Sequence, residues 1–188
     1  NWNKAVAGLG VYYNICKMTQ KNHGCCGHTF AAIDGAIAIR QTLLKKGISF
    51  SEIERINVQT YQTALDVTGN FSPKSAFQCR FSLPYVVSHG LLHGSVRLNA
   101  FTDEQMASPE TRELMKKLTL LSDDELTSKF PNQRAARIKI TLKDGQTFEH
   151  FSPCRKGDPE APLTDEELDH KFFELADGVI SAEQAKIL

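Results

Sequence analysis

The stretch KNHGCCGHTFAAIDGAIAIRQTLLKKG, residues 21–47, joins a glycine-rich loop to a long helix. Its glycines predict a loop over residues 21–28, and Thr29 can cap the helix that follows. Beyond Thr29 the apolar positions recur every three or four residues, which predicts an amphipathic helix that ends at Lys45-Lys46-Gly47. The positions of this apolar stripe are Phe30, Ile33, Ile37, Leu44 and the stem of Arg40, widened by Ala36 and Leu43.

Strand patterns follow this helix at residues 55–63, 118–121, 134–142 and 146–151. Period-two alternation predicts that the first strand is half-buried. Its two faces carry Ile56, Val58 and Thr60 on one side, and Asn57, Gln59 and Tyr61 on the other. The last two segments flank Asp144-Gly145, a typical turn signal, and therefore predict a hairpin.

Helix patterns cover residues 74–93 in two pieces, residues 102–118, and a segment that opens at Thr164. Ser82 is the expected cap of the second piece, and Gly94 is its expected end. Thr164 and Glu167 have the spacing of a capping box. The apolar stripe of that last helix is Leu168, Phe172, Leu175 and Ala176. Few strands with several helices predict an α+β fold.

Composition limits the function classes. The 188 residues carry 22 basic and 22 acidic side chains, and 41% of them are hydrophobic. This is the composition of a globular domain, alone or with an appendage, and excludes disorder as the main state. A neutral chain is not expected to bind nucleic acid, and no apolar run approaches the roughly 20 residues of a membrane helix.

Cysteine usage and the first residues suggest a cellular context. The five cysteines, an odd number without a visible disulfide framework, are Cys16, Cys25, Cys26, Cys79 and Cys154. Reduced thiols and a cytoplasmic location are therefore expected. Asn1 begins the chain without Met or signal-peptide architecture, so we expect a processed chain or part of a longer protein.

The loop at residues 21–28 is the most reactive stretch in the sequence. It leads into a helix amino terminus, where backbone amides and the helix dipole favour anions. Lys21, His23 and His28 are expected to add donors and titratable groups near the same point, so the loop suits carboxylate binding and proton transfer. The alternative is a structural turn with cysteines packed beneath it and histidines in water. The residues alone leave both interpretations open.

Other candidates carry weaker signals. A metal could be bound by His23, Cys25, Cys26 and His28, but their spacing differs from that of structural zinc sites. His89 and His93 share one helix face, and their position near the helix carboxyl end accounts for them without a metal. Tyr85 is typical of a core residue, and Arg80 of either a surface ion pair or a forked contact to a carboxylate.

Several motifs, taken in order, resemble one family. They are Lys21 with Gly24-Cys25-Cys26-Gly27-His28-Thr29, Ala31-Ala32-Ile33-Asp34, Ile53-Glu54-Arg55-Ile56, Phe81-Ser82-Leu83-Pro84-Tyr85, Phe101-Thr102-Asp103, the Asp144-Gly145 hairpin, Gly157-Asp158-Pro159 and Pro162-Leu163-Thr164. The series resembles the MmgE/PrpD proteins, which include 2-methylcitrate dehydratase, cis-aconitate decarboxylase and iminodisuccinate epimerase.

The resemblance implies a division of the chain. Members of the family pair an all-helical domain with a smaller α+β lid, a small mixed sheet packed with helices. Residues 1–20 would then be the tail of the helical domain, residues 21–158 the lid, and residues 159–188 a helical segment that returns to the helical domain. The active site of the family lies between the two domains, so half of it is expected to be missing from this chain.

The resemblance also implies a chemistry and its residues. We expect a hydro-lyase of the 2-methylcitrate dehydratase type, acting on a citrate-like polycarboxylate in propionate metabolism, as a homodimer without cofactor or metal. The expected catalytic residues are His28, Lys21 and Tyr85, and the expected substrate-binding residues are His23, Arg80 and Ser82. Many relatives have a second histidine where this chain has Phe30, which leaves the substrate open. The alternatives are a non-catalytic binding or assembly module and a His/Cys metal-binding protein.

Overall fold

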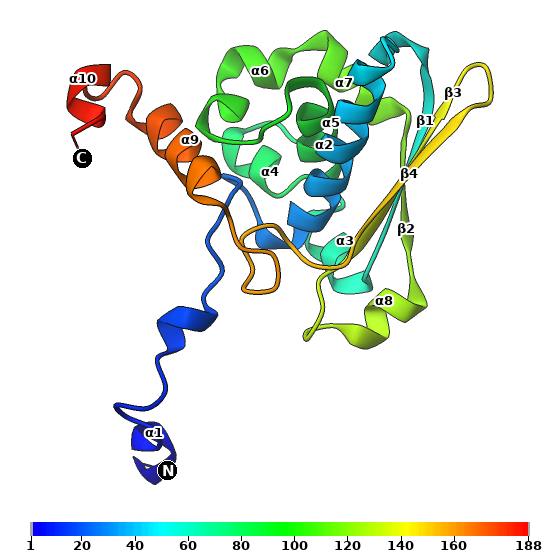
Figure 1. Ribbon diagram of the computed structural model, residues 1–188. Helices are drawn as coiled ribbons and strands as arrows, with labels where there is room; N and C mark the ends of the chain where they lie inside the picture. The colour runs from blue at the N-terminus through cyan, green and yellow to red at the C-terminus, as the bar shows by residue number, and fades with distance from the viewer. Residues whose placement is uncertain (1, 188) are drawn as a thin grey trace.

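Helix α2 (Phe30–Lys45) packs against a four-stranded sheet in the computed structural model of the chain, which describes residues 2–187 (Figure 1). The strands are β1 (Ile53–Thr60), β2 (Leu118–Ser122), β3 (Ala136–Leu142) and β4 (Thr147–Ser152), in the spatial order β2-β1-β3-β4. Strand β1 pairs in parallel with β2 and antiparallel with β3, which in turn pairs antiparallel with β4. The predicted α+β fold with a small mixed sheet is confirmed.

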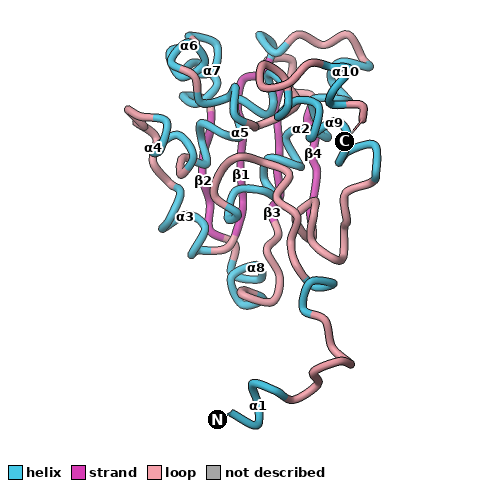
Figure 2. Tube along the Cα trace, turned by 90° about the vertical axis from the view of Figure 1, so that its left-hand side faces the viewer, coloured by secondary structure: helices cyan, strands magenta, loops and turns pink. Residues whose placement is uncertain are grey.

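Most of the remaining helices lie beside α2 or at the ends of the sheet, whereas α1 and α10 lie outside this body (Figure 1). The remaining helices are α1 (Trp2–Val6), α3 (Gln62–Thr68), α4 (Ala76–Arg80), α5 (Leu83–His93), α6 (Asp103–Ala107), α7 (Pro109–Lys116), α8 (Asp124–Lys129), α9 (Asp165–Ala176) and α10 (Ala182–Ala185). Helices α2 and α5 cover one face of the sheet (Figures 1 and 2). The other face carries charged pairs such as Lys139–Glu149 at 2.5 Å, as expected of a surface in water. None of the helices at residues 2–187 is long and apolar enough to cross a bilayer.

The core lies between α2, α5 and the sheet. Its buried residues include Ala32, Ala36, Ile39 and Leu43 of α2, Val87 and Leu91 of α5, and Ile56, Val58, Ile138 and Ile140 of the sheet. Gly35 lets α2 approach β3 closely, because a Cβ atom there would lie only 2.9 Å from Cγ1 of Ile138. The small residues of α2 therefore set the distance between the two layers.

Most predicted element ends are confirmed. The hydroxyl of Ser82 accepts from the Tyr85 amide at 3.2 Å and caps α5, and Gly94 ends that helix with φ of +80°. Thr164 and Glu167 form the capping box of α9. The hairpin of β3 and β4 and the short strand β2 also form where they were predicted.

Three local expectations are wrong. Thr29 stands before α2, but its hydroxyl donates to the Cys26 carbonyl at 2.7 Å and makes no cap bond. Leu44, expected in the buried stripe, is 50% exposed, because α2 is covered on two sides and its alanines form much of the buried face. Strand β1 ends at Thr60, and Tyr61, expected on the exposed face, turns inward before α3 and is buried.

The two ends of the chain carry apolar side chains that the described residues leave exposed. The segment before residue 19 extends away from the helices and the sheet (Figure 1). Its exposed large apolar residues are Trp2, Val6, Leu9, Val11, Tyr12, Tyr13, Ile15 and Met18. The expected stripe of α9 is exposed in part, with Phe172 and Leu175 about 40% accessible. The division of the chain at residues 20 and 158 stays a prediction.

The contact at Gly35 predicts a steric limit on the core. Gly35→Val would place branched methyl groups against Ile138 and lower the free energy of unfolding by about 1–3 kcal/mol. Ala38→Val, which adds similar bulk to the half-buried side of the same helix, is the matched control. Urea unfolding of both variants measures the difference, and equal stabilities would contradict the close packing of α2 on β3.

Candidate functional site

His28 and Tyr61 meet where the amino terminus of α2 lies beside the end of β1. His28 belongs to the 3-10 turn Gly27–Thr29 that leads into α2, and Tyr61 follows the last residue of β1. The Nδ1 atom of His28 lies 2.7 Å from the hydroxyl of Tyr61. The ring of Phe130 stacks on Tyr61 at 4.7 Å between centroids and also contacts His28. The histidine and the tyrosine are therefore held in one fixed geometry.

Burial and nearby cations bias the protonation of this pair. Burial lowers the pKa of His28 below its ordinary value, and the positive charges of Arg134 and Arg155 lower it further. Burial also raises the pKa of Tyr61 to about 12, against the opposing effect of the same two arginines. A neutral imidazole and a neutral phenol thus face each other near neutral pH, one able to accept a proton and the other able to donate one.

Arg155 is held next to the loop that carries His28. Its Nε and Nη2 atoms donate to the two oxygens of Asp158 at 2.9 and 2.5 Å, and Nη2 also donates to Thr19 at 2.9 Å. Burial raises the pKa of Asp158, but the hydrogen bonds from Arg155 and Thr19 outweigh it, so that the pKa lies below its ordinary value. A Cβ atom on Gly27 would lie 3.1 Å from Nη1 of Arg155.

An open cleft of about 940 Å³ adjoins these arginines. Its lining comprises Lys17, Thr19, Pro131, Asn132, Gln133, Arg134, Pro153, Cys154, Arg155, Asp158, Pro159 and Glu160. Arg134 places its guanidinium carbon 5.8 Å from the centroid of the Phe130 ring, the same ring that stacks on Tyr61. The cleft therefore combines cationic donors with a proton-accepting and proton-donating pair beside it.

The other loop residues point elsewhere. Lys21 is exposed and donates from Nζ to the Cys25 carbonyl at 3.4 Å. His23 is buried, with Nε2 3.0 Å from Oδ1 of Asp34, and its Nδ1 atom has no partner among the described residues. The expectation that Lys21, His23 and His28 converge on one point is thus wrong, because His23 turns toward α2 while His28 turns toward Tyr61.

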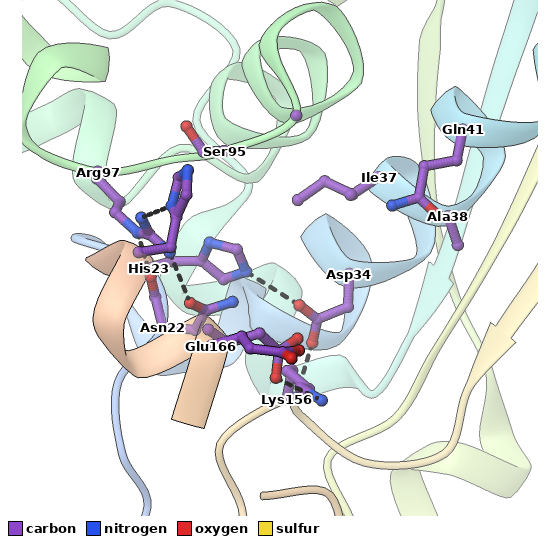
Figure 3. A pocket seen from close by; sticks show the side chains of 13 residues that line it. Asn22, His23, Asp34, Ile37, Ala38, Gln41, Ser95, Arg97, Lys156 and Glu166 are labelled. Carbon is purple, nitrogen blue, oxygen red and sulfur yellow. Dashed lines mark hydrogen bonds and ion pairs between the residues drawn. The ribbon is translucent and has the colours of Figure 1, made fainter. Parts of the chain in front are cut away.

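His23 and Asp34 line a second hollow, of about 500 Å³, between α2 and α9 (Figure 3). The second oxygen of Asp34 accepts from the Lys156 amide at 2.8 Å. The ammonium of Lys156 pairs with Glu167 of α9 at 2.9 Å. The loop, α2 and α9 are therefore linked through one carboxylate and one lysine.

Arg97 provides a stronger link between α9 and the loop (Figure 3). Its guanidinium donates to the carbonyl and side-chain oxygens of Asn22 at 3.3 and 3.2 Å. The Nη1 atom of Arg97 contacts Glu174 in an ion pair and His170 at 3.2 Å, both on α9. In addition, Lys171 donates to the Lys21 carbonyl at 2.7 Å. Helix α9 thus holds the first residues of the loop in place.

The side chains of three expected site residues have partners other than the His28–Tyr61 pair. Tyr85, expected to be catalytic, is fully buried and faces no cleft in the described structure. Its hydroxyl donates to the Ala100 carbonyl at 2.5 Å, and burial raises its pKa. Ser82 is also buried and uses its hydroxyl as a helix cap and as a donor to Asn70. Arg80 lies over the Phe101 ring at 5.0 Å, and its Nε atom is buried without a partner in the described structure. The hydroxyl groups of Tyr85 and Ser82 are thus both used in hydrogen bonds within the fold.

The expected metal-binding alternative lacks a suitable cluster. Across residues 2–187, no group of three or more His, Cys, Asp or Glu side chains is placed to hold a metal ion. His23 and His28 have separate partners, and Cys25 packs in the core, where burial raises its pKa to about 12. All five cysteines are free thiols in the structure.

Sequence reasoning missed three residues of this site. Tyr61 was assigned to the exposed face of a strand, although the strand ends one residue earlier. Arg134 and Arg155 lie more than 100 residues after His28, next to the hairpin and in the loop after it, and no short motif joins them to it. The only available signal was that both are basic residues beside Pro/Gly-rich turns.

Residues 23–188 match the family model for the MmgE/PrpD C-terminal domain. The cis-aconitate decarboxylase of Mus musculus is 37% identical over 100 residues, 53% of this chain and 20% of that protein. The mitochondrial 2-methylcitrate dehydratase of Yarrowia lipolytica is 26% identical over 129 residues, 66% of this chain and 25% of that protein. The cis-aconitate decarboxylase of Aspergillus terreus is 24% identical over 190 residues, 97% of this chain and 39% of that protein. The chain thus spans between a fifth and two fifths of these relatives.

Removing one cation should change the titration of His28. Arg134→Gln is expected to raise the pKa of His28 toward its ordinary value, because a positive charge that opposes the imidazolium is lost. Arg55→Gln, an exposed change near the other end of β1, is the matched control. NMR titration of the His28 ring measures both pKa values, and an unchanged value in Arg134→Gln would contradict the electrostatic coupling.

Breaking the ion pair of Arg97 should loosen α9 and the loop together. Glu174→Gln leaves a mostly buried guanidinium without its countercharge, so we expect amide exchange at Gly24 and along α9 to accelerate by about tenfold or more. Glu113→Gln removes one partner of an exposed pair with Lys116 and serves as the control. Faster exchange in α9 without any change at Gly24 would show that the two are independent.

Proposed function

The chain belongs to the MmgE/PrpD family, and from that membership we propose that it contributes His28 and Tyr61 to a lyase acting on a citrate-like polycarboxylate. The observation that carries the proposal is the 2.7 Å contact between His28 and Tyr61, placed beside Arg134 and Arg155. The similarity to a decarboxylase of cis-aconitate and a dehydratase of 2-methylcitrate supports a polycarboxylate substrate.

The pair can supply both a base and an acid. In the tautomer with a proton on Nδ1, His28 donates to the Tyr61 oxygen, which leaves Nε2 free to accept a proton and the phenol hydrogen free to be donated. His28 then removes the proton from the carbon next to a substrate carboxylate. Tyr61 donates its proton to the departing hydroxyl group, so that water leaves and a double bond forms. In decarboxylation the C–CO2 bond breaks instead, carbon dioxide leaves, and an acid such as Tyr61 supplies the proton that forms the new C–H bond. In epimerisation His28 removes the proton from carbon and an acid returns a proton to the opposite face.

Neutral forms of both groups suit this assignment. The lowered pKa of His28 keeps the imidazole unprotonated near neutral pH, as a general base requires. The raised pKa of Tyr61, about 12, keeps its proton in place until it is transferred. The charge that develops on the substrate carboxylate is stabilised by nearby cationic donors. Lys21, expected to be catalytic, stays a candidate donor at the exposed end of the loop.

A second domain is part of this proposal. The apolar side chains left exposed on residues 2–18 and on α9 are of the kind that a protein interface covers. We propose that a helical domain packs on them and completes the active site across the cleft from His28. A homodimer, a cytoplasmic location and a role in propionate metabolism stay predictions. Dehydration of 2-methylcitrate is the reaction that we propose first.

The test is turnover by the protein expressed from its complete reading frame, with 2-methylcitrate and cis-aconitate as alternative substrates. His28→Gln and Tyr61→Phe are each expected to lower kcat by about 10² to 10⁴ with folding retained, because each removes one proton-transfer group. His150→Gln, at an exposed position of β4, is the control for loss of a histidine. Turnover of either substrate that persists unchanged in His28→Gln would sink the role assigned to His28.

A further inference from the structure

We propose that Arg155 and Arg134 together form the subsite that binds one carboxylate group of the substrate, with Gly27 keeping that subsite open. This inference rests on the proposed function, because it assigns part of the substrate to residues beside the His28–Tyr61 pair. It adds two residues that neither the motif resemblance nor the sequence patterns indicated.

Arg155 is oriented as a preformed anion donor. Two hydrogen bonds to Asp158 and one to Thr19 occupy its Nε and Nη2 atoms. The Asp158 carboxylate also accepts from the Arg155 backbone amide, so it fixes both the backbone and the guanidinium of Arg155. The Nη1 atom has no hydrogen-bond partner among the described residues, although the side chain is only 13% exposed. A guanidinium held in this way loses little conformational freedom when Nη1 binds a ligand oxygen.

Gly27 leaves room at that nitrogen. A methyl group at residue 27 would stand 3.1 Å from Nη1, where a ligand oxygen would otherwise sit. The φ of Gly27 does not lie in the left-handed region, so the backbone does not require glycine there. The absence of a side chain next to Nη1, one residue before His28, is explained if the space is used by a ligand.

Arg134 supplies the charge that Arg155 cannot. The Asp158 carboxylate compensates the charge of Arg155, whereas Arg134 makes no ion pair with any described acidic residue and contacts the Phe130 ring. Both arginines line the same cleft, and both lower the pKa of His28. The arrangement therefore offers a directed donor from Arg155 and an uncompensated positive charge from Arg134, close to the proposed base.

The free Nη1 atom of Arg155 and the guanidinium of Arg134 can each donate a charge-assisted hydrogen bond to a carboxylate oxygen. A carboxylate bound between the arginines would lie next to the loop that holds His28. The subsite would thus anchor one carboxylate of a polycarboxylate while the carbon beside it faces the imidazole. Inorganic phosphate carries similar oxygens and is the competing anion that the experiment must separate.

The experiment measures citrate binding by calorimetry in the protein expressed from its complete reading frame. We expect Arg155→Lys and Arg134→Gln to weaken citrate binding by about tenfold or more, because each removes a charge-assisted donor. Gly27→Ala should weaken citrate binding similarly while leaving the bonds between Arg155 and Asp158 intact. This variant therefore still tests the subsite if Arg155→Lys fails to fold. Arg55→Gln should leave the affinity unchanged.

The outcomes separate the two proposals. If citrate binding depends on Arg155, Arg134 and Gly27 but the protein turns over neither 2-methylcitrate nor cis-aconitate, the subsite stands and the proposed function fails. If turnover depends on His28 while KM and citrate affinity are unchanged in all three variants, the subsite is overturned. Binding of inorganic phosphate as tight as that of citrate would also overturn the assignment to carboxylates.

Discussion

The close approach of α2 to the sheet at Gly35 determines where the His28–Tyr61 pair lies. Because the helix packs directly on β3, its amino terminus meets the end of β1, and the residues that precede the helix come to rest beside those that follow the strand. His28 and Tyr61 are adjacent for this reason, although 33 positions separate them in the chain. The geometry of the site thus depends on packing in the core, where a single missing side chain sets the distance between the layers.

Much of this fold could be predicted from local patterns, because those patterns have local physical causes. Period-two alternation placed Ile56 and Val58 inside, and short-range hydrogen bonds marked the helix ends at Ser82 and Thr164. The site was harder to predict, because its contacts join distant segments. Tyr61 escaped detection since periodicity holds only inside a strand, and the chain changes direction just after Thr60. Tyr85 looked functional in its motif, but only the fold shows that the Ala100 carbonyl occupies its hydroxyl.

The three arginines near the site differ in how far their charges and donors are already paired. Arg97 has a structural role, because its guanidinium donates to both Asn22 and α9 and so links the loop to that helix. Arg155 is fixed by Asp158 but keeps one nitrogen free, and Arg134 keeps its charge uncompensated. A chain with no net charge can therefore still present cationic donors locally, because the cleft is lined by Lys17, Arg134 and Arg155 against Asp158 and Glu160.

The bond from Lys171 to the carbonyl of Lys21 spans 150 positions of the chain. During synthesis the loop therefore leaves the ribosome 150 residues before the lysine of α9 that fastens it. At about 5–20 residues per second, the loop waits for many seconds before its ties can form. A chain released early would keep the sheet and its core but lack the fastening helix. The ties between the loop and α9 can therefore form only after α9 has been synthesised.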